Sequence, residues 1–100
     1  MEKYGKLIID KDNVITVVAD CESGDTITIK DKSEKHHYVC NQSVPFGHKI
    51  AIKDINIGEN IIKYGEAIGA ASKAIKKGDW VHIHNTIDTY KVLDKAGNPL

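Results

Sequence analysis

Apolar residues along this chain fall into short runs separated by turn-forming residues, a pattern typical of an all-β protein. Residues 14–19 are β-branched and almost continuously apolar, which predicts a buried strand. Residues 26–30 alternate strictly between polar and apolar, as a half-buried strand does, and 36–40 are expected to return as the hairpin partner. Further strands or apolar runs are expected at residues 6–9, 49–52, 54–59, 60–64 and 80–84.

The segment 67–75 fits two kinds of secondary structure. Its alanines favour a helix by intrinsic propensity. Gly69 and the short span between two turns favour a strand, and on balance we predict a strand. Residues 86–100 show only weak alternation, and we expect a tail there that orders on a partner.

Two segments repeat one theme, an isoleucine followed after two residues by glycine and an acid. The theme occurs at residues 55–59 and 75–79, each time leading into an expected strand. A repeat this brief does not build a solenoid. It suits a compact β fold with short, irregular strands.

Composition and charge narrow the classes of function. One hundred residues form a single domain with one small core. The 14 basic residues balance 14 acidic ones, so the formal net charge is zero, which argues against a nucleic-acid partner. All the basic residues are lysines, so the chain offers no guanidinium fork to a carboxylate or phosphate.

The cysteines and the hydropathy pattern bear on the cellular location. Cys21 and Cys40 lie far apart and form no C-x-x-C motif, so we expect buried, reduced thiols rather than a zinc site or a disulfide framework. No apolar run is long enough to cross a membrane, and no signal-peptide pattern is seen. We therefore expect a cytoplasmic protein with no membrane partner.

The candidate chemistry depends on three histidines. His82 and His84 are two apart in the last predicted strand, so they should share one face, with Val81 and Ile83 on an apolar face behind them. His48 follows a Pro-x-Gly turn. Imidazoles in such places are candidate metal ligands or acid–base groups. Two structural alternatives stay open: a solvated strand face for the pair, and a loop-capping role for His48.

Several other residues have both a structural and a functional interpretation. Asn85 ends the predicted strand and is either a turn residue or a substrate ligand. Trp80 shares the face of the histidine pair and is either a packing or interface anchor or a platform for a sugar ring. We expect His36 and His37 at the hairpin surface, and Tyr64 in a packing role.

An ordered series of segments carries a resemblance to a known family. The segments read VPFGHKIA at 44–51, DI-x-x-GE at 54–59, IIKYGE-x-IG at 61–69 and G-x-WVHIHN at 78–85, with DNV early in the chain at 12–14. Together they resemble the SAF domain of the altronate/galactarate dehydratase family. The resemblance covers about residues 5–86, and the small subunit of sulfolactate sulfo-lyase is similar in size and pattern.

This resemblance implies a β-clip fold, related to that of type III antifreeze proteins, as one domain over residues 1–86 with a tail at 87–100. In the family the domain is the N-terminal part of a sugar-acid dehydratase or a separate small subunit. The resemblance thus implies a large dehydratase subunit as partner and an anionic sugar acid or related hydroxy acid as substrate. It leaves homo-oligomerisation open.

The implied chemistry is metal-assisted β-elimination of water, or of sulfite, from a hydroxy acid, with iron or manganese as the divalent metal of the assembled enzyme. The chain alone is expected to be inactive, because one small core leaves no enclosed site. The alternative is a non-catalytic β-clip module that binds a ligand or partner. The resemblance implies catalytic roles for His48 and His82, metal ligation by His82 and His84, and substrate binding by Lys49, Lys63 and Asn85.

Overall fold

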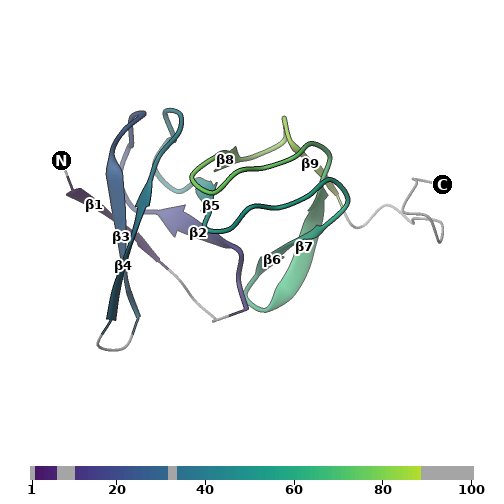
Figure 1. Ribbon diagram of the computed structural model, residues 1–100, viewed down its shortest axis with the longest axis horizontal. Coiled ribbons are helices and arrows are strands. Elements are labelled where there is room, and N and C mark those ends of the chain that lie inside the picture. The colour runs from purple at the N-terminus through teal and green to yellow at the C-terminus, as the bar shows by residue number, and fades with distance from the viewer. Residues whose placement is uncertain (1, 7–10, 32–33, 89–100) are drawn as a thin grey trace.

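The computed structural model describes residues 2–6, 11–31 and 34–88, and these residues form strands and no helix (Figure 1). The all-β prediction is therefore confirmed for the described chain. None of the described segments is a helix long and apolar enough to cross a membrane. The strands are β1 (Glu2–Lys6), β2 (Val14–Val17), β3 (Thr26–Asp31), β4 (Glu34–Val39), β5 (Lys49–Ala51), β6 (Asn60–Lys63), β7 (Glu66–Ala71), β8 (Trp80–Val81) and β9 (Thr86–Asp88).

The strands form two sheets. The larger has the order β4-β3-β1-β2-β5-β8, and the smaller has the order β6-β7-β9. β1 pairs with β3 in parallel, and every other pair of described strands is antiparallel. Figure 1 shows the β3–β4 hairpin at one end of the molecule and the smaller sheet towards the other. Because β8 belongs to the larger sheet and β9 to the smaller, the turn between them lies where the two sheets meet.

Some strand predictions are confirmed, and others have different bounds. β3 and β4 form the expected hairpin, and β7 confirms the strand interpretation of the alanine-rich segment as far as Ala71. The first strand ends at Lys6 rather than beginning there, and residues 7–10 lie outside the described residues. The last predicted strand stops at Val81. The segment expected to be a tail begins inside β9, and residues 89–100 lie outside the described residues.

Two clusters of buried side chains form the core, and β2 contributes to both. Val14 packs in one cluster, whereas Ile15 and Val17 pack in the other. Both faces of β2 are therefore buried, which confirms the predicted buried strand for residues 14–17. The prediction extended to residue 19, but the strand ends at Val17, and Val18 is 46% exposed. The larger cluster contains Ile15, Val17, Cys21, Ile27, Ile29, Cys40, Val44, Ile50 and Ile52, and the smaller contains Val14, Ala51, Ile55, Ile61, Ala71, Ile75 and Val81.

The two cysteines are buried free thiols, as expected. Burial raises the pKa of the Cys21 thiol and raises that of Cys40 to about 11. Both thiols are therefore protonated at neutral pH, and they pack as small apolar side chains in the larger cluster.

Four turns of one type set the course of the chain. In each, the N–H of the fourth residue donates to the carbonyl of the first, with N···O distances of 2.9 to 3.1 Å. Each third residue is a glycine, with φ of 91°, 83°, 86° and 93° in chain order. A type II turn requires this positive φ at its third residue, which glycine alone adopts without strain. The turns span residues 22–25, 45–48, 56–59 and 76–79.

The four turns are joined in two pairs by isolated β-bridges. Cys21 bridges Val44, and Ile55 bridges Ile75. All four bridging residues are almost fully buried. The theme seen in the sequence at 55–59 and 75–79 therefore corresponds to the second pair of turns. The first pair has Cys21 and Val44 in place of the two isoleucines, so the sequence pattern did not reveal it.

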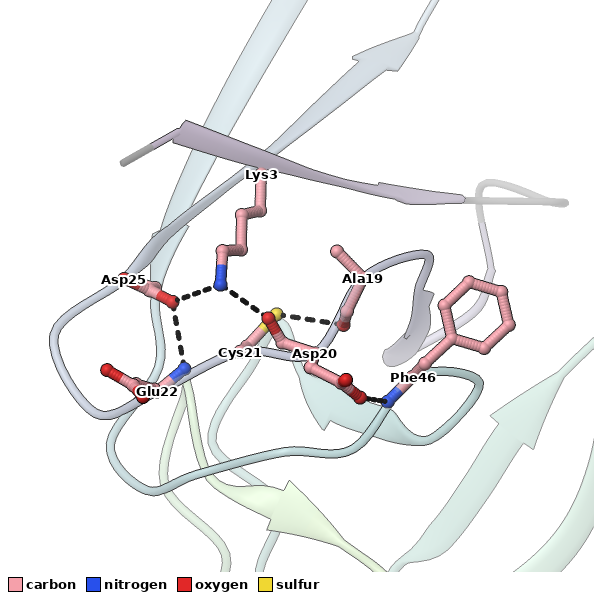
Figure 2. Close-up of polar contacts among 7 residues, drawn as sticks. All are labelled: Lys3, Ala19, Asp20, Cys21, Glu22, Asp25 and Phe46. Atoms are coloured by element: carbon pink, nitrogen blue, oxygen red, sulfur yellow. Dashed lines mark hydrogen bonds and ion pairs between the residues drawn. The ribbon is translucent and has the colours of Figure 1, made fainter.

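An aspartate just before one turn of each pair braces the other turn. Asp20 Oδ1 accepts the N–H of Phe46 at 2.8 Å, as Figure 2 shows. Asp54 Oδ1 accepts the N–H of Lys77 at the same distance, 2.8 Å. Each pair of turns therefore has an equivalent aspartate hydrogen bond in addition to the same backbone arrangement.

The acid at the fourth position of two turns caps its own turn. Asp25 Oδ2 accepts the N–H of Glu22 at 2.8 Å and forms an ion pair with Lys3 Nζ at 2.9 Å (Figure 2). These contacts lower the pKa of Asp25. Asp79 Oδ2 accepts the N–H of Lys76 in the same way, at 2.8 Å.

Gly78→Ala should destabilise the protein far more than Gly24→Ala, although the two glycines have φ of 93° and 91°. A Cβ at Gly24 meets nothing within 4 Å, so only the left-handed backbone would cost stability, about 1–2 kcal/mol. A Cβ at Gly78 would lie 2.2 Å from the backbone oxygen of Val39, and a backbone atom cannot turn aside as the end of a flexible side chain can. Urea unfolding curves of both variants check this, and equal losses would contradict it.

Candidate functional site

The turn that follows β8 is held by the side chain of Asn85. Its Oδ1 accepts the N–H of His82 at 3.0 Å, and its Nδ2 donates to the carbonyl of Trp80 at 2.8 Å. The Thr86 hydroxyl donates to the His82 carbonyl at 2.8 Å. Because these backbone groups are engaged locally, the strand ends, and Ile83 is 82% exposed. The prediction of a histidine face backed by a buried Ile83 is therefore wrong.

Three imidazoles nevertheless converge, and the side chain they share is Trp80. The ring centroids of His48, His82 and His84 lie 5.7, 5.3 and 5.1 Å from that of Trp80. The His82 ring stacks on the indole at an interplanar angle of 9°, and its centroid lies 4.6 Å from that of His48. We call these four residues the imidazole cluster. It is assembled by ring packing around Trp80 rather than by alternation along a strand.

Trp80 is fixed by its backbone and by a network of amides around Asp79. Trp80 pairs with Ile50 across β5 and β8, and its N–H donates to Gln42 Oε1 at 2.8 Å. The side-chain amides of Asn41 and Gln42 donate to Asp79 Oδ1 at 2.8 and 3.2 Å. Burial raises the pKa of Asp79, but the cap of its own turn and these two amides outweigh burial and leave the pKa lowered. The half-buried indole packs against the larger core cluster.

His48 stands at the fourth position of its turn, where Asp25 and Asp79 cap theirs. Its ring turns instead to Trp80, whose Nε1–H donates to His48 Nδ1 at 3.2 Å. An indole N–H can only donate, so Nδ1 accepts and the ring proton of neutral His48 lies on Nε2. The interpretation of His48 as a cap of its own loop is therefore wrong. The residue presents an N–H donor at Nε2.

The His82 imidazole is held in its neutral form. Partial burial lowers its pKa below the ordinary value of 6.5, and the nearby positive charges of His48, His84 and Lys49 lower it further. His82 is therefore an unprotonated base at neutral pH, and its ring lies 4.6 Å, between centroids, from the ring of His48, whose Nε2 carries a hydrogen.

Lys49 and His82 line a pocket of about 130 Å³ to which both sheets contribute. The pocket contains no carboxylate, and among the described side chains Lys49 forms no ion pair. Ligand pockets usually measure about 300–1,000 Å³, so this one is small for a sugar acid. Its lining residues are Lys49, Ile61, Ile68, Gly69, Val81, His82, Ile83 and Thr86.

Two of the expected substrate-binding residues are engaged in holding the fold. Lys63 is 8% exposed, donates to the Thr16 hydroxyl and lies 4.7 Å from the ring centroid of Tyr64. Asn85 is 6% exposed, and both ends of its amide bond backbone groups. The structure thus joins Lys49 to the imidazole cluster and places Lys63 in a contact between β6 and β2.

The adjacent histidines of β4 lie in the hairpin, as expected. His37 is exposed, and its Nδ1 lies 3.0 Å from the hydroxyl of Thr28 on β3. His36 is half-buried. Because β4 and β8 are at opposite ends of the strand order, this pair serves as a histidine reference outside the imidazole cluster.

The described residues of this chain do not by themselves fit a divalent metal. Among them, no group of three or more His, Cys, Asp or Glu side chains is arranged to hold one. A zinc-type catalytic site uses three protein ligands, and Nδ1 of His48 is already the acceptor for Trp80. The expected pair of His82 and His84 would therefore need further ligands from elsewhere.

Nuclear magnetic resonance titration should give the His82 ring a pKa below 6.5, the direction that burial and its neighbours impose. His48→Gln should raise this pKa by removing an adjacent positive charge, and Lys49→Gln should raise it less. Since the unfolded chain binds this proton more readily, the free energy of unfolding should fall as pH drops below 6.5 and level off beneath the folded pKa. His82→Gln should remove that part of the pH dependence. A His82 pKa above 6.5 would overturn the assignment of a neutral base.

Comparison with known proteins identifies the family of this chain. The model of the altronate/galactarate dehydratase SAF domain matches residues 3–89, which confirms the resemblance found in the sequence. The alpha subunit of (2R)-sulfolactate sulfo-lyase from Chromohalobacter salexigens is 34% identical over 73 residues, covering 71% of this chain and 78% of that subunit.

Altronate dehydratase from Escherichia coli is 38% identical over 84 residues, covering 84% of this chain and 16% of that enzyme. Galactarate dehydratase (L-threo-forming) from the same species is 48% identical over 40 residues, covering 40% of this chain and 8% of that enzyme. The chain therefore spans most of a sulfo-lyase alpha subunit but a small part of either dehydratase. On the match over residues 3–89, the chain belongs to the SAF-domain family of altronate/galactarate dehydratases.

Proposed function

We propose that this chain is the SAF component of a lyase acting on an anionic hydroxy acid, and that it works with a larger dehydratase-type chain. The observation that carries the proposal is the convergence of three imidazoles on Trp80, with a neutral His82 beside the N–H donor of His48. The relatives support the class of reaction, since they are named as two dehydratases and a sulfo-lyase subunit.

A larger partner is supported by the names and sizes of these relatives. The sulfo-lyase relative is named a subunit, and the dehydratases are about six times or more the length that this chain matches, since it covers 16% of one and 8% of the other. The pocket beside His82 also argues for a partner, because about 130 Å³ cannot enclose a sugar acid. The larger chain would supply the remaining walls of the site.

In the proposed reaction, neutral His82 accepts the proton on the carbon next to the substrate carboxylate. The C–H electron pair becomes the C=C bond of an enol as the C–O bond on the neighbouring carbon breaks and its electron pair leaves with the hydroxide. The proton that His82 has accepted passes to the departing hydroxide to give water, and the Nε2–H of His48 donates a hydrogen bond to that oxygen; sulfite would leave through the C–S bond without needing the proton. Cationic groups of the larger chain would offset the negative charge that develops on the carboxylate.

A divalent metal, which the family resemblance implies, would require ligands beyond the described residues of this chain. We propose that the larger chain holds it. No step above depends on that metal.

In the assembled enzyme, His82→Gln and His48→Ala should each lower kcat by on the order of 10²-fold or more, since the first removes the base and the second removes the hydrogen-bond donor to the leaving oxygen. His37→Gln, in the β3–β4 hairpin, is the matched control and should leave kcat unchanged. The melting temperatures should change little, because His82 and His48 are only half-buried. Assays would follow formation of the 2-oxo acid from altronate and galactarate, and of sulfite from sulfolactate, by the purified complex.

Full activity in both cluster variants would favour the alternative function, a non-catalytic β-clip module that holds a partner or ligand. Turnover by the isolated chain at the rate of the complex would contradict the need for a partner. A large fall in melting temperature in the cluster variants alone would instead assign the histidines to the fold.

A further inference from the structure

We propose that the rim of the pocket beside His82 is the surface on which the larger lyase chain docks, with Ile83 as its central contact. The surface comprises Lys49, Ile68, His82 and Ile83, and we call it the Ile83 surface. This inference rests on the proposed function and goes further, because it places the subunit contact directly beside the imidazole cluster.

The apolar part of the Ile83 surface is unusually open. Ile83 is 82% exposed, more than any other large hydrophobic residue in the described chain, and Ile68 on the same pocket is 40% exposed. Isoleucine usually packs inside, and here it stands between two histidines at the tip of a turn. A partner that covers it would gain apolar burial that this chain does not achieve alone.

The turn that carries Ile83 is held in shape before any partner binds. The Asn85 side chain accepts the N–H of His82 and donates to the carbonyl of Trp80, and the Thr86 hydroxyl donates to the His82 carbonyl. The Asn85 carbonyl in turn accepts the N–H of Ser72 at 2.9 Å. A contact residue presented on a rigid turn loses little conformational freedom on binding, which favours a docking role.

Charge indicates what the partner surface offers. The pocket is lined by one ammonium, one imidazole and no carboxylate, and Lys49 has no ion pair among the described side chains. A half-buried, unpaired cation is complemented by an anion. The proposed partner surface is therefore an apolar patch that receives Ile83, with an acidic side chain placed to reach Lys49.

The chain provides closely matched controls. Ile57 is 69% exposed on the turn at 56–59 and is absent from the pocket lining, so Ile57→Ser repeats the chemical change outside the surface. Lys53 is an exposed lysine that likewise lies outside the lining, so Lys53→Gln is the control for Lys49→Gln. Because Ile83 and Ile57 are largely exposed, both serine variants should fold.

The test is calorimetric titration of the purified larger lyase chain from the same organism with this chain. Ile83→Ser should weaken Kd at least tenfold, as expected for the centre of an interface, while Ile57→Ser should change it less than twofold. Lys49→Gln should weaken binding and reduce its dependence on salt, whereas Lys53→Gln should do neither.

The possible outcomes distinguish a failure of the docking surface from a failure of the proposed function. A wild-type complex whose Kd is unchanged by both Ile83→Ser and Lys49→Gln would overturn the docking surface and leave the proposed function standing. Failure of the wild-type chains to bind at all would overturn the proposed function itself. A homodimer of this chain that Ile83→Ser dissociates would assign the surface to a second copy and overturn the inference.

Discussion

The left-handed glycine at the third position of four turns is the constraint on which this structure depends. Each of these glycines donates its N–H to a carbonyl on a distant segment, at 2.8 to 2.9 Å. The turns therefore join parts of the chain that are far apart in sequence, and not only adjacent strands. The described residues form no helix and no strand longer than six residues, so such contacts satisfy backbone groups that longer ladders would otherwise pair.

Repetition of one turn leaves its fourth position available for different uses. The carboxylates of Asp25 and Asp79 cap their own turns, and that of Asp79 also accepts the side-chain amides of Asn41 and Gln42 beside Trp80. His48 has the same backbone place, but its ring is bonded to Trp80 instead. The backbone of the turn thus positions His48 and leaves its side chain free to bond Trp80. Trp80 itself directly follows the equivalent turn at 76–79. Two copies of the same turn, at 45–48 and 76–79, therefore position the two residues that meet in the imidazole cluster, His48 and Trp80.

The sequence predicted the fold better than it predicted the geometry of the site. Alternation and turn residues are local signals, so they identified the β3–β4 hairpin, the buried β2 and the strand character of β7. The alternation of residues 80–84 was misleading, because the amide of Asn85 captures the His82 N–H that a longer strand would have used. Gln42 was missed altogether, since it meets Trp80 across 38 residues of sequence and no periodic pattern marks such a contact.

Long-range contacts also decided which charged residues were available for chemistry. Lys49 and Lys63 are both lysines beside predicted strands, and sequence offered no way to rank them. The structure buries Lys63 against Thr16 and leaves Lys49 unpaired among the described side chains. The pocket that Lys49 shares with His82 has no carboxylate in its lining, so the charge of that ammonium is unbalanced there. A site in which burial and then neighbouring cations lower the pKa of the base is complete only when an anion arrives, whether from a partner chain or from an acid substrate.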